Sequence, residues 1–130
     1  MTILRSRPTR LAAALALLVP LGAGAAPGDG RPHVQRCGWI QNPSPANWYL
    51  VDRDGEWLMG QQGGHQAKGL DEVQDLTARH WTVTNGSSYG YGCGCVTGAF
   101  DTRSKRATAI ARVRQKPLAA CRADRKLPRP

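Results

Sequence analysis

The sequence has no apolar run long enough to anchor it in a membrane. Its longest apolar run, from Leu11 to Val19, ends at Pro20 and is far short of the roughly 20 residues that a membrane-spanning helix requires. No cysteine follows this run closely, and Cys37 lies too far along the chain for a lipoprotein-type attachment. We therefore expect neither a retained transmembrane segment nor a lipid anchor.

Common signatures of catalysis and metal binding are also missing. The chain contains no Gly-x-Ser-x-Gly and no His-Glu-x-x-His motif. Neither His65 nor His80 stands at a ligand-like spacing from the cysteines, which argues against a zinc or copper site. These absences favour a protein without metal or cofactor, and a binding or structural protein over an enzyme.

The N-terminal apolar run instead has the pattern of a secretory signal peptide. Three arginines precede it, and Ala23-Gly24-Ala25 supplies a small-x-small cleavage site. The sequence thus predicts a signal peptide over residues 1–25 and a flexible leader over residues 26–36. The mature protein should be periplasmic or secreted.

Positive charge is concentrated near the C-terminus. The chain has 18 Lys and Arg against 9 Asp and Glu, a formal net charge of +9. Ten of the basic residues follow Asp101: Arg103, Lys105, Arg106, Arg112, Arg114, Lys116, Arg122, Arg125, Lys126 and Arg129. Such a segment suits an anionic glycan or lipid of the cell envelope, or is simply a solvated tail. Export argues against nucleic acid as the partner.

The stretch from Tyr89 to Val96 predicts the central β-strand. Side chains two apart share a face of a strand, so two tyrosines and two cysteines lie on one face and three glycines on the other. Alternating glycines indicate that something packs very close to their face. A core side chain such as a tryptophan is one candidate, and a ligand is the other.

The other elements are short and mostly strands. Cys37–Ile40, Trp48–Val51, Glu56–Met59, Trp81–Thr84 and Ala107–Val113 should be strands, with hairpin turns at Arg53–Gly55 and Asn85–Gly86. Leu70–Ala78 and Pro117–Cys121 suit short helices, and Asn42–Asn47 and Gln61–Gly69 suit loops. We predict a mainly β, small antiparallel sheet or barrel-like domain of five or six short strands, with one or two short helices. It would span residues 37–127, with a frayed end over 128–130.

The four cysteines predict two disulfides, because export compartments are oxidising. Cys93 and Cys95 project from one strand in the same direction, and a bond between them would be strained. Each should therefore pair outward, one with Cys37 and one with Cys121; the two possible pairings stay open. A redox dithiol at Cys93-Gly94-Cys95 is disfavoured, because the usual motif has two intervening residues.

The two loops and the basic segment are the predicted contact surface. The candidate binding residues are Asn42, Asn47, Trp48, Tyr49, His65, Gln66, Arg103, Lys105 and Arg106. The leading hypothesis is a monomeric, non-enzymatic binding module of the envelope, acting on an anionic component or on a protein such as a cell-wall hydrolase. One alternative is a small hydrolase with His65 as general base beside Asp54 or Glu56; another is a purely structural envelope protein.

Several short motifs together resemble one family of small exported proteobacterial proteins. They are Cys37-Gly38-Trp39-Ile40, Asn42-Pro43-x-Pro45-x-Asn47-Trp48, Asp52-Arg53-Asp54-Gly55-Glu56-Trp57, Thr84-Asn85-Gly86, Tyr89-Gly90-Tyr91-Gly92-Cys93-x-Cys95 and Pro117-Leu118-x-x-Cys121-Arg122. The family is known as domain of unknown function 4087, and the resemblance covers roughly residues 37 to 127. It implies that the cysteines and hairpins are framework, and it carries no catalytic residues.

Overall fold

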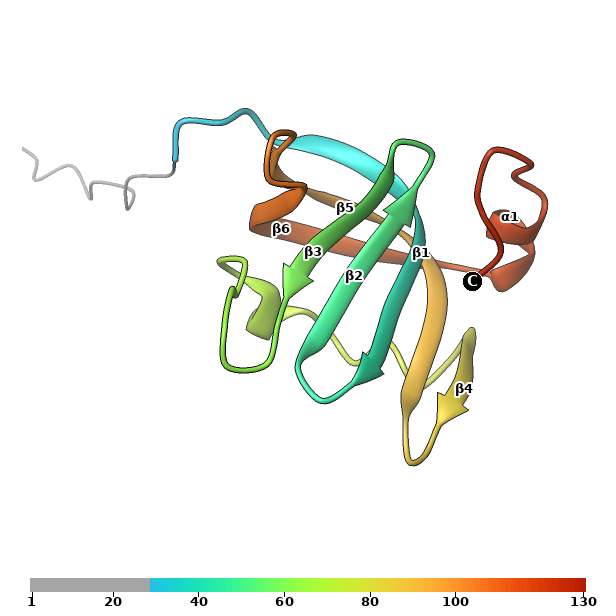
Figure 1. Ribbon diagram of the computed structural model, residues 1–130. Coiled ribbons are helices and arrows are strands. Elements are labelled where there is room, and N and C mark those ends of the chain that lie inside the picture. The colour runs from blue at the N-terminus through green and yellow to red at the C-terminus, as the bar shows by residue number, and fades with distance from the viewer. Residues whose placement is uncertain (1–28) are drawn as a thin grey trace, which may run out of the picture.

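Six strands and one short helix make up the computed structural model, which describes residues 29–130. The predicted signal peptide and the start of the leader lie outside the described residues. In chain order the elements are β1 (Val34–Ser44), β2 (Asn47–Asp52), β3 (Gly55–Gly60), the 3-10 turn η1 (Leu70–Glu72), β4 (Trp81–Asn85), β5 (Tyr89–Asp101), β6 (Arg106–Lys116) and α1 (Leu118–Arg122) (Figure 1). The predicted mainly β fold is confirmed.

The strands close into a small barrel. Their order is β1-β2-β3-β6-β5-β4, and the long β1 also pairs with β5, which joins five of them in a ring. All neighbours are antiparallel except β3 and β6, which meet in parallel at Leu58 and Arg106, so the sheet is mixed rather than purely antiparallel. This strand order fixes the architecture and leaves the function open.

The glycine face of β5 points into the barrel and is covered by side chains and backbone. A Cβ at Gly92 would lie 2.8 Å from the ring of Trp81, and one at Gly94 would lie 2.8 Å from Cδ1 of Ile40. At Gly90 a Cβ would collide with the backbone oxygen of Thr82. The glycines therefore make room for the close approach of core side chains and backbone, a tryptophan among them, which was one of the two alternatives.

Apolar side chains form two clusters on opposite faces of the sheet. The larger cluster fills the barrel and includes Ile40, Leu50, Trp57, Val96 and Phe100, all buried. The smaller one lies outside the barrel, where Trp39, Val51 and Cys93 of the sheet pack with Cys121. Burying both faces of this sheet gives a short chain more apolar contact than one face would allow.

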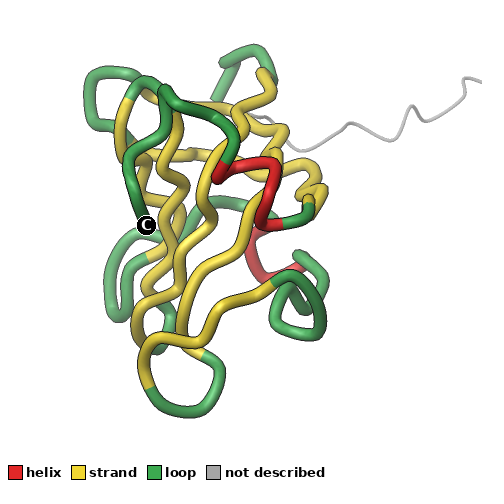
Figure 2. The backbone as a smooth tube through the Cα atoms, turned by 90° about the vertical axis from the view of Figure 1, so that its right-hand side faces the viewer, coloured by secondary structure: helices red, strands yellow, loops and turns green. Residues whose placement is uncertain are grey.

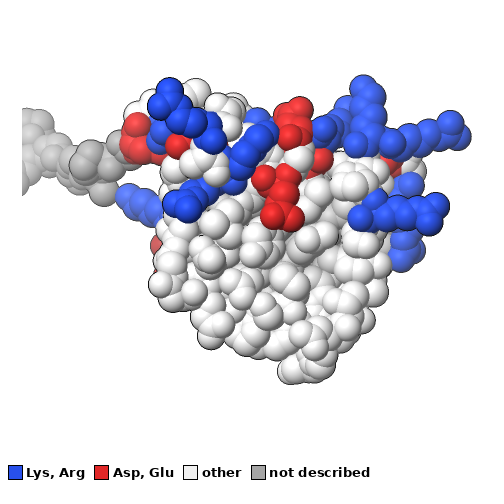
Figure 3. Space-filling view, in the orientation of Figure 1, with Lys and Arg blue, Asp and Glu red and all other residues white. Residues whose placement is uncertain are grey.

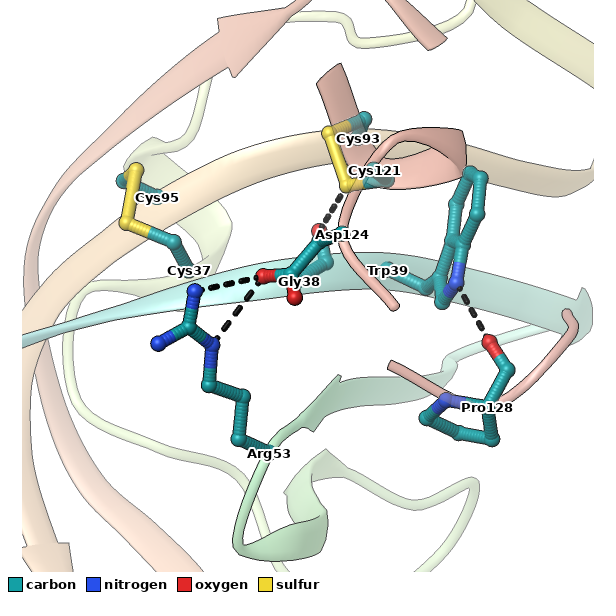
Figure 4. Close-up of a disulfide and its surroundings, with 9 residues drawn as sticks. All are labelled: Cys37, Gly38, Trp39, Arg53, Cys93, Cys95, Cys121, Asp124 and Pro128. Atoms are coloured by element: carbon teal, nitrogen blue, oxygen red, sulfur yellow. Dashed lines mark hydrogen bonds and ion pairs between the residues drawn. A yellow bond between two sulfur atoms is a disulfide. The ribbon is translucent and has the colours of Figure 1, made fainter. Parts of the chain in front are cut away.

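The C-terminal segment covers the outer cluster and is fixed there at several points. Figure 2, seen from this side, shows the loop after α1 turning back over the strands. The Cys93–Cys121 disulfide ties α1 to β5, Arg53 donates to Asp124 at 2.9 Å, and Trp39 Nε1 donates to the carbonyl of Pro128 at 2.9 Å (Figure 4). The segment is therefore packed on the barrel as far as Pro128, while its basic side chains are exposed.

The second disulfide joins Cys37 to Cys95, which are direct partners in the pairing of β1 with β5, with Cα atoms 4.0 Å apart. The prediction that Cys93 and Cys95 pair separately, one with each distant cysteine, is confirmed. Cys37 is exposed and Cys95 is buried, so this bridge lies at the surface of the sheet.

The prediction of a loop over Asn42–Asn47 is wrong. β1 runs through Pro43 to Ser44, and β2 starts at Asn47, so only Pro45 and Ala46 form the turn. Proline is tolerated in β1 at this point because register between β1 and β2 breaks between Gln41 and Ser44. The leader boundary also shifts, because β1 begins at Val34.

Two other local predictions need correction. The stretch Leu70–Ala78 is helical only over Leu70–Glu72, although Leu70 and Leu76 are buried as expected.

The second hairpin turns at Gly86–Ser88, with Asn85 still paired to Tyr89 and Ser87 at a φ of 55°. Local turn propensity favoured Asn-Gly, and the bulge in the β4–β5 register moved the turn by one residue.

Candidate functional site

The two ends of the barrel differ in their charge. We call the end with the β2–β3 and β5–β6 turns the ion-paired end, and the end with the β1–β2 turn the pocket end. On the face shown in Figure 3, charged side chains gather over the upper part of the molecule, and none lies over the lower part, where the β1–β2 turn and β4 lie.

At the ion-paired end, polar groups converge on the buried carboxylate of Asp52, while Nε of Arg36 is buried without a hydrogen-bond partner among residues 29–130. The carboxylate accepts hydrogen bonds from Arg36 Nη1 at 2.8 Å, from Trp57 Nε1 at 3.0 Å and from the backbone nitrogen of Asp54 at 2.8 Å. The guanidinium of Arg36 also lies 3.9 Å from the centre of the Trp57 ring, a favourable cation–π distance. The network ties β1, β2 and β3 together.

Two further contacts extend this network to the surface. Arg36 donates to the carboxylate of Asp54 at 2.7 Å, and this hydrogen bond holds the pKa of Asp54 below its usual value. Lys105, in the β5–β6 turn, donates to the backbone oxygen of Asp54 at 3.0 Å and lies 4.4 Å from the centre of the Trp57 ring. Lys105 thus links the β5–β6 turn to the β2–β3 turn.

At the pocket end, a cavity of about 240 Å³ opens between the barrel and the chain segment 66–77. Its walls are mostly apolar, and the polar side chains lie at the rim. The lining residues are Ile40, Ala46, Trp48, Met59, Gln66, Leu70, Asp71, Val73, Gln74, Asp75, Leu76, Thr77 and Val113. A concave apolar site with a few polar groups at its edge is the usual form of a binding pocket.

The tryptophan wall of the pocket is held rigidly. With its carboxamide oxygen facing the indole, Asn42 accepts from Trp48 Nε1 at 2.8 Å and donates to the backbone oxygen of Ser44 at 3.3 Å. The Trp48 ring lies 6.2 Å from that of Trp81, whose Nε1 donates to the backbone oxygen of Ser88 at 2.9 Å. Both indole N–H groups are therefore used internally, so the rings offer a ligand their faces.

The opposite wall is an irregular segment held down by side chains. Gln115 of β6 donates through Nε2 to the backbone oxygens of Leu76 at 2.7 Å and Arg79 at 2.5 Å. Gln74 donates to the backbone oxygen of Val113 at 3.2 Å. Leu76 is buried at the same time, so this wall of the pocket is held by the protein's own contacts.

The predicted binding residues separate into three groups. Asn42, Trp48 and Gln66 come together at the pocket end. Asn47 has a framework role, because it donates to Ser44 Oγ at 2.7 Å and accepts from the backbone nitrogen of Gln62 at 3.0 Å. Tyr49 lies on the outer face of β2.

The basic candidates Arg103, Lys105 and Arg106 lie at the opposite, ion-paired end. They therefore do not share a site with Trp48 and Gln66. The predicted contact surface, which joined the loops to the basic segment, divides into two regions of different chemistry.

His65 is part of the framework of its loop. Its Nε2 donates to the backbone oxygen of Ala107 at 2.7 Å, and Gly60 and Lys68 on either side form bridges to Gln66 and Ala109. The loop Gln61–Gly69 is thus bonded to β3 and β6. Within residues 29–130 no hydrogen bond joins His65 to Asp54 or Glu56.

The apolar walls of the pocket were not among the predicted site residues. The spacing of Leu70, Val73 and Leu76 indicated a face that points into the domain. It did not indicate that a cavity remains beside that face. That space depends on how the segment meets Ile40, Met59 and Val113, which come from three distant strands.

The described residues, 29–130, contain no cluster of three or more His, Cys, Asp or Glu side chains that could hold a metal ion. Nor does any helix in this part of the chain have the length and apolar character needed to cross a membrane.

The fold and the pocket define a small β-barrel domain with two disulfides and an apolar cavity at one end. The chain belongs to the family described as "Protein of unknown function (DUF4087)", which it matches over residues 32–128. No curated protein and no solved structure matches it.

Proposed function

We propose that the mature chain is an exported, non-enzymatic binding domain of the bacterial cell envelope, and that its site is the cavity at the pocket end. The observation that carries this proposal is the apolar cavity itself, whose walls are held in place by hydrogen bonds of the protein. A preformed site avoids the cost of ordering its walls upon binding.

Two features support the export of the protein. The N-terminal sequence has the pattern of a signal peptide. All four cysteines are paired in disulfides, which persist in oxidising compartments and are rare in the cytosol.

The chemistry of the cavity suits an apolar side chain presented by a protein partner. Leu70, Leu76 and Ile40 offer no hydrogen bond inside, and the face of Trp48 forms one side. Asp71 and Asp75 are exposed at the rim, so a basic residue beside the apolar one would gain a favourable charge interaction. A cell-wall hydrolase that presents such a pair of side chains is the partner we favour.

The hydrolase alternative depends on His65 and is weakened by the contacts of that residue. A general base must reach its substrate proton, but Nε2 of His65 is engaged by Ala107, and the ring does not line the cavity. A purely structural role would leave the cavity without a ligand. A test of the proposal must therefore distinguish a protein that binds a partner from one that binds none.

The experiment uses two matched substitutions of valine by phenylalanine. Val73→Phe fills the cavity from its lining, whereas Val83→Phe adds the same ring at an exposed position of β4 outside the cavity. Each processed protein is immobilised and exposed to envelope extract at moderate salt, and retained proteins are identified by mass spectrometry.

We expect one partner to be retained by the wild type and by Val83→Phe and to be lost with Val73→Phe. Equal retention by all three proteins would place the site elsewhere, and retention of none would favour the structural role. Unchanged thermal unfolding of Val73→Phe is required as the folding control.

A further inference from the structure

One edge of β4 has no partner strand among the residues that the structure describes. β4 pairs with β5 alone and stands last in the strand order, outside the ring formed by the other five strands. Figure 1 shows it, in yellow, at the margin of the molecule. Val83, Thr84 and Asn85 are exposed. Val83 is 54% exposed, the higher value of the two large apolar side chains at the surface of residues 29–130.

The backbone of Val83 faces this open edge. A Cβ at Gly90, the direct partner of Val83, would collide with the backbone oxygen of Thr82, so that oxygen points toward β5. The backbone groups of successive residues in a strand point to opposite edges. The N–H and C=O of Val83 therefore point away from β5, and the open edge offers a donor and an acceptor side by side.

β4 lacks the features that usually protect an exposed edge. Such edges are commonly blocked by charged side chains or by proline, but the sequence has no Lys, Arg, Asp, Glu or Pro between Trp81 and Phe100. The three residues from Thr82 to Thr84 are all β-branched, which favours strand pairing. Only the short length of β4 and the register bulge after Val83 limit this edge.

The sequence of β4 is complementary to itself. Thr82-Val83-Thr84 reads the same in both directions, so an antiparallel copy centred on Val83 places Thr82 opposite Thr84 of the second copy. Threonine pairs across neighbouring strands are favourable. The outward N–H and C=O of Val83 then bond to the same two groups of the second copy. This reciprocal contact is the one that a two-fold axis requires.

We propose that two copies of the chain pair in antiparallel fashion through β4, about a two-fold axis at Val83. The sheet of each copy then continues into the other, and the protein is a dimer in place of the monomer that the sequence suggested. A pair of five-residue strands makes a small interface, and small interfaces give weak, reversible association. The dimer does not depend on the binding role proposed above; under that role it would present two cavities to one target.

Sedimentation velocity of the processed protein, from micromolar to millimolar concentration, measures the association. We expect the wild type to pass from monomer to dimer over this range. Added salt should strengthen the dimer, because salt screens the repulsion between two positively charged copies and β4 itself carries no charge. Hydrogen exchange at the backbone amide of Val83 should slow as the dimer forms.

Charge at position 83 provides the sharpest test. Val83→Lys places two like charges opposite each other at the axis and should weaken association roughly ten-fold or more; Val83→Glu should do the same. A mixture of the two variants should dimerise, because opposite charges then meet, and this result also shows that both variants fold. Thr102→Lys adds the same charge at an exposed position of the β5–β6 turn and should dimerise like the wild type.

A wild type that stays monomeric up to millimolar concentration would overturn the proposal. Equal dimerisation of Val83→Lys and the wild type would overturn the assignment to β4, and so would a mixture of the two charged variants that stays monomeric. If exchange at Val83 slows only when envelope extract is added to monomeric protein, the edge belongs to another protein, and the pairing of two copies is wrong.

Discussion

At the ion-paired end of the barrel the carboxylate of Asp52 accepts three hydrogen bonds from neighbouring groups. At the pocket end the indole N–H groups are satisfied, but the ring faces and the apolar walls around them are left uncovered. The first arrangement uses its polar groups to hold strands together. The second holds its aromatic rings still and leaves their surfaces for a ligand.

This contrast changes how the charge of the protein should be understood. The basic residues that stand out in the sequence include Lys105, which is engaged by Asp54 and Trp57. Three acidic residues, Asp71, Glu72 and Asp75, lie near or at the rim of the pocket. Net charge therefore describes neither end of the barrel, and local contacts decide which partner each end suits.

The largest expected effect comes from removing the central carboxylate of the ion-paired end. Asp52→Ala should lower the free energy of unfolding by about 4 kcal/mol, because it leaves the guanidinium of Arg36 with its buried acceptor missing and Trp57 Nε1 unpaired. Urea denaturation measures the loss. Binding at the pocket end, measured at urea concentrations below the unfolding transition, should be unchanged. A decrease of less than about 1 kcal/mol in the free energy of unfolding would show that the network does not stabilise the fold.

The next effect concerns the C-terminal segment. Replacing Cys93 and Cys121 together by alanine should lower the free energy of unfolding by about 3 kcal/mol and expose Trp39 to solvent. Tryptophan fluorescence should shift to longer wavelength while the cavity at the other face of the sheet is retained. Hydrogen exchange that rises throughout the barrel, and not mainly over residues 117–128, would contradict the separation of the two apolar clusters.

A smaller effect is expected at the glycine that makes room for Trp81. Gly92→Ala places a Cβ 2.8 Å from the Trp81 ring, and moving that ring should cost roughly 1–2 kcal/mol. Because Trp81 packs on Trp48, affinity at the cavity should fall as well. Gly86→Ala, at a turn position with open space around it, is the control and should change neither property.

The smallest effect is an acid-dependent one at the ion-paired end. The pKa of Asp54 is lowered by its hydrogen bond to Arg36, so the native state favours the ionised carboxyl. The resulting stability is present above the ordinary pKa of about 3.8 and is lost as the pH falls through the lowered value.

Asp54→Asn removes this contribution. Between pH 5 and pH 2 the wild type should therefore lose more stability than the variant, as thermal unfolding over that range can show. Parallel pH curves for the two proteins would mean that the Arg36–Asp54 contact has no energetic weight.

The elements that the sequence predicted best are those fixed by local chemistry. Alternation of Tyr, Gly and Cys in β5 correctly indicated a strand with one closely packed face and separate disulfides for Cys93 and Cys95. The Arg53–Gly55 turn between two apolar runs also gave the expected hairpin.

The parts that the sequence did not predict depend on contacts between distant strands. β1 continues through Pro43 because β5 pairs along its length up to Asn42. The segment after η1 is irregular because Gln115, from a strand almost forty residues later, binds its backbone. For the same reason the lining of the cavity was anticipated only in part. Trp48, directly after one expected loop, and Gln66, within the other, were candidate binding residues, whereas the apolar walls were indistinguishable from ordinary core.

The central claim is that the pocket end contacts a partner in the cell envelope and the ion-paired end does not. The most direct measurement places a photo-crosslinking residue at Gln66, at the rim of the cavity, and in a second protein at Arg106, at the ion-paired end, with both expressed in the native host. We predict one discrete adduct from position 66 that disappears when Val73→Phe is added, and none from position 106. A discrete adduct from position 106 alone would contradict the account.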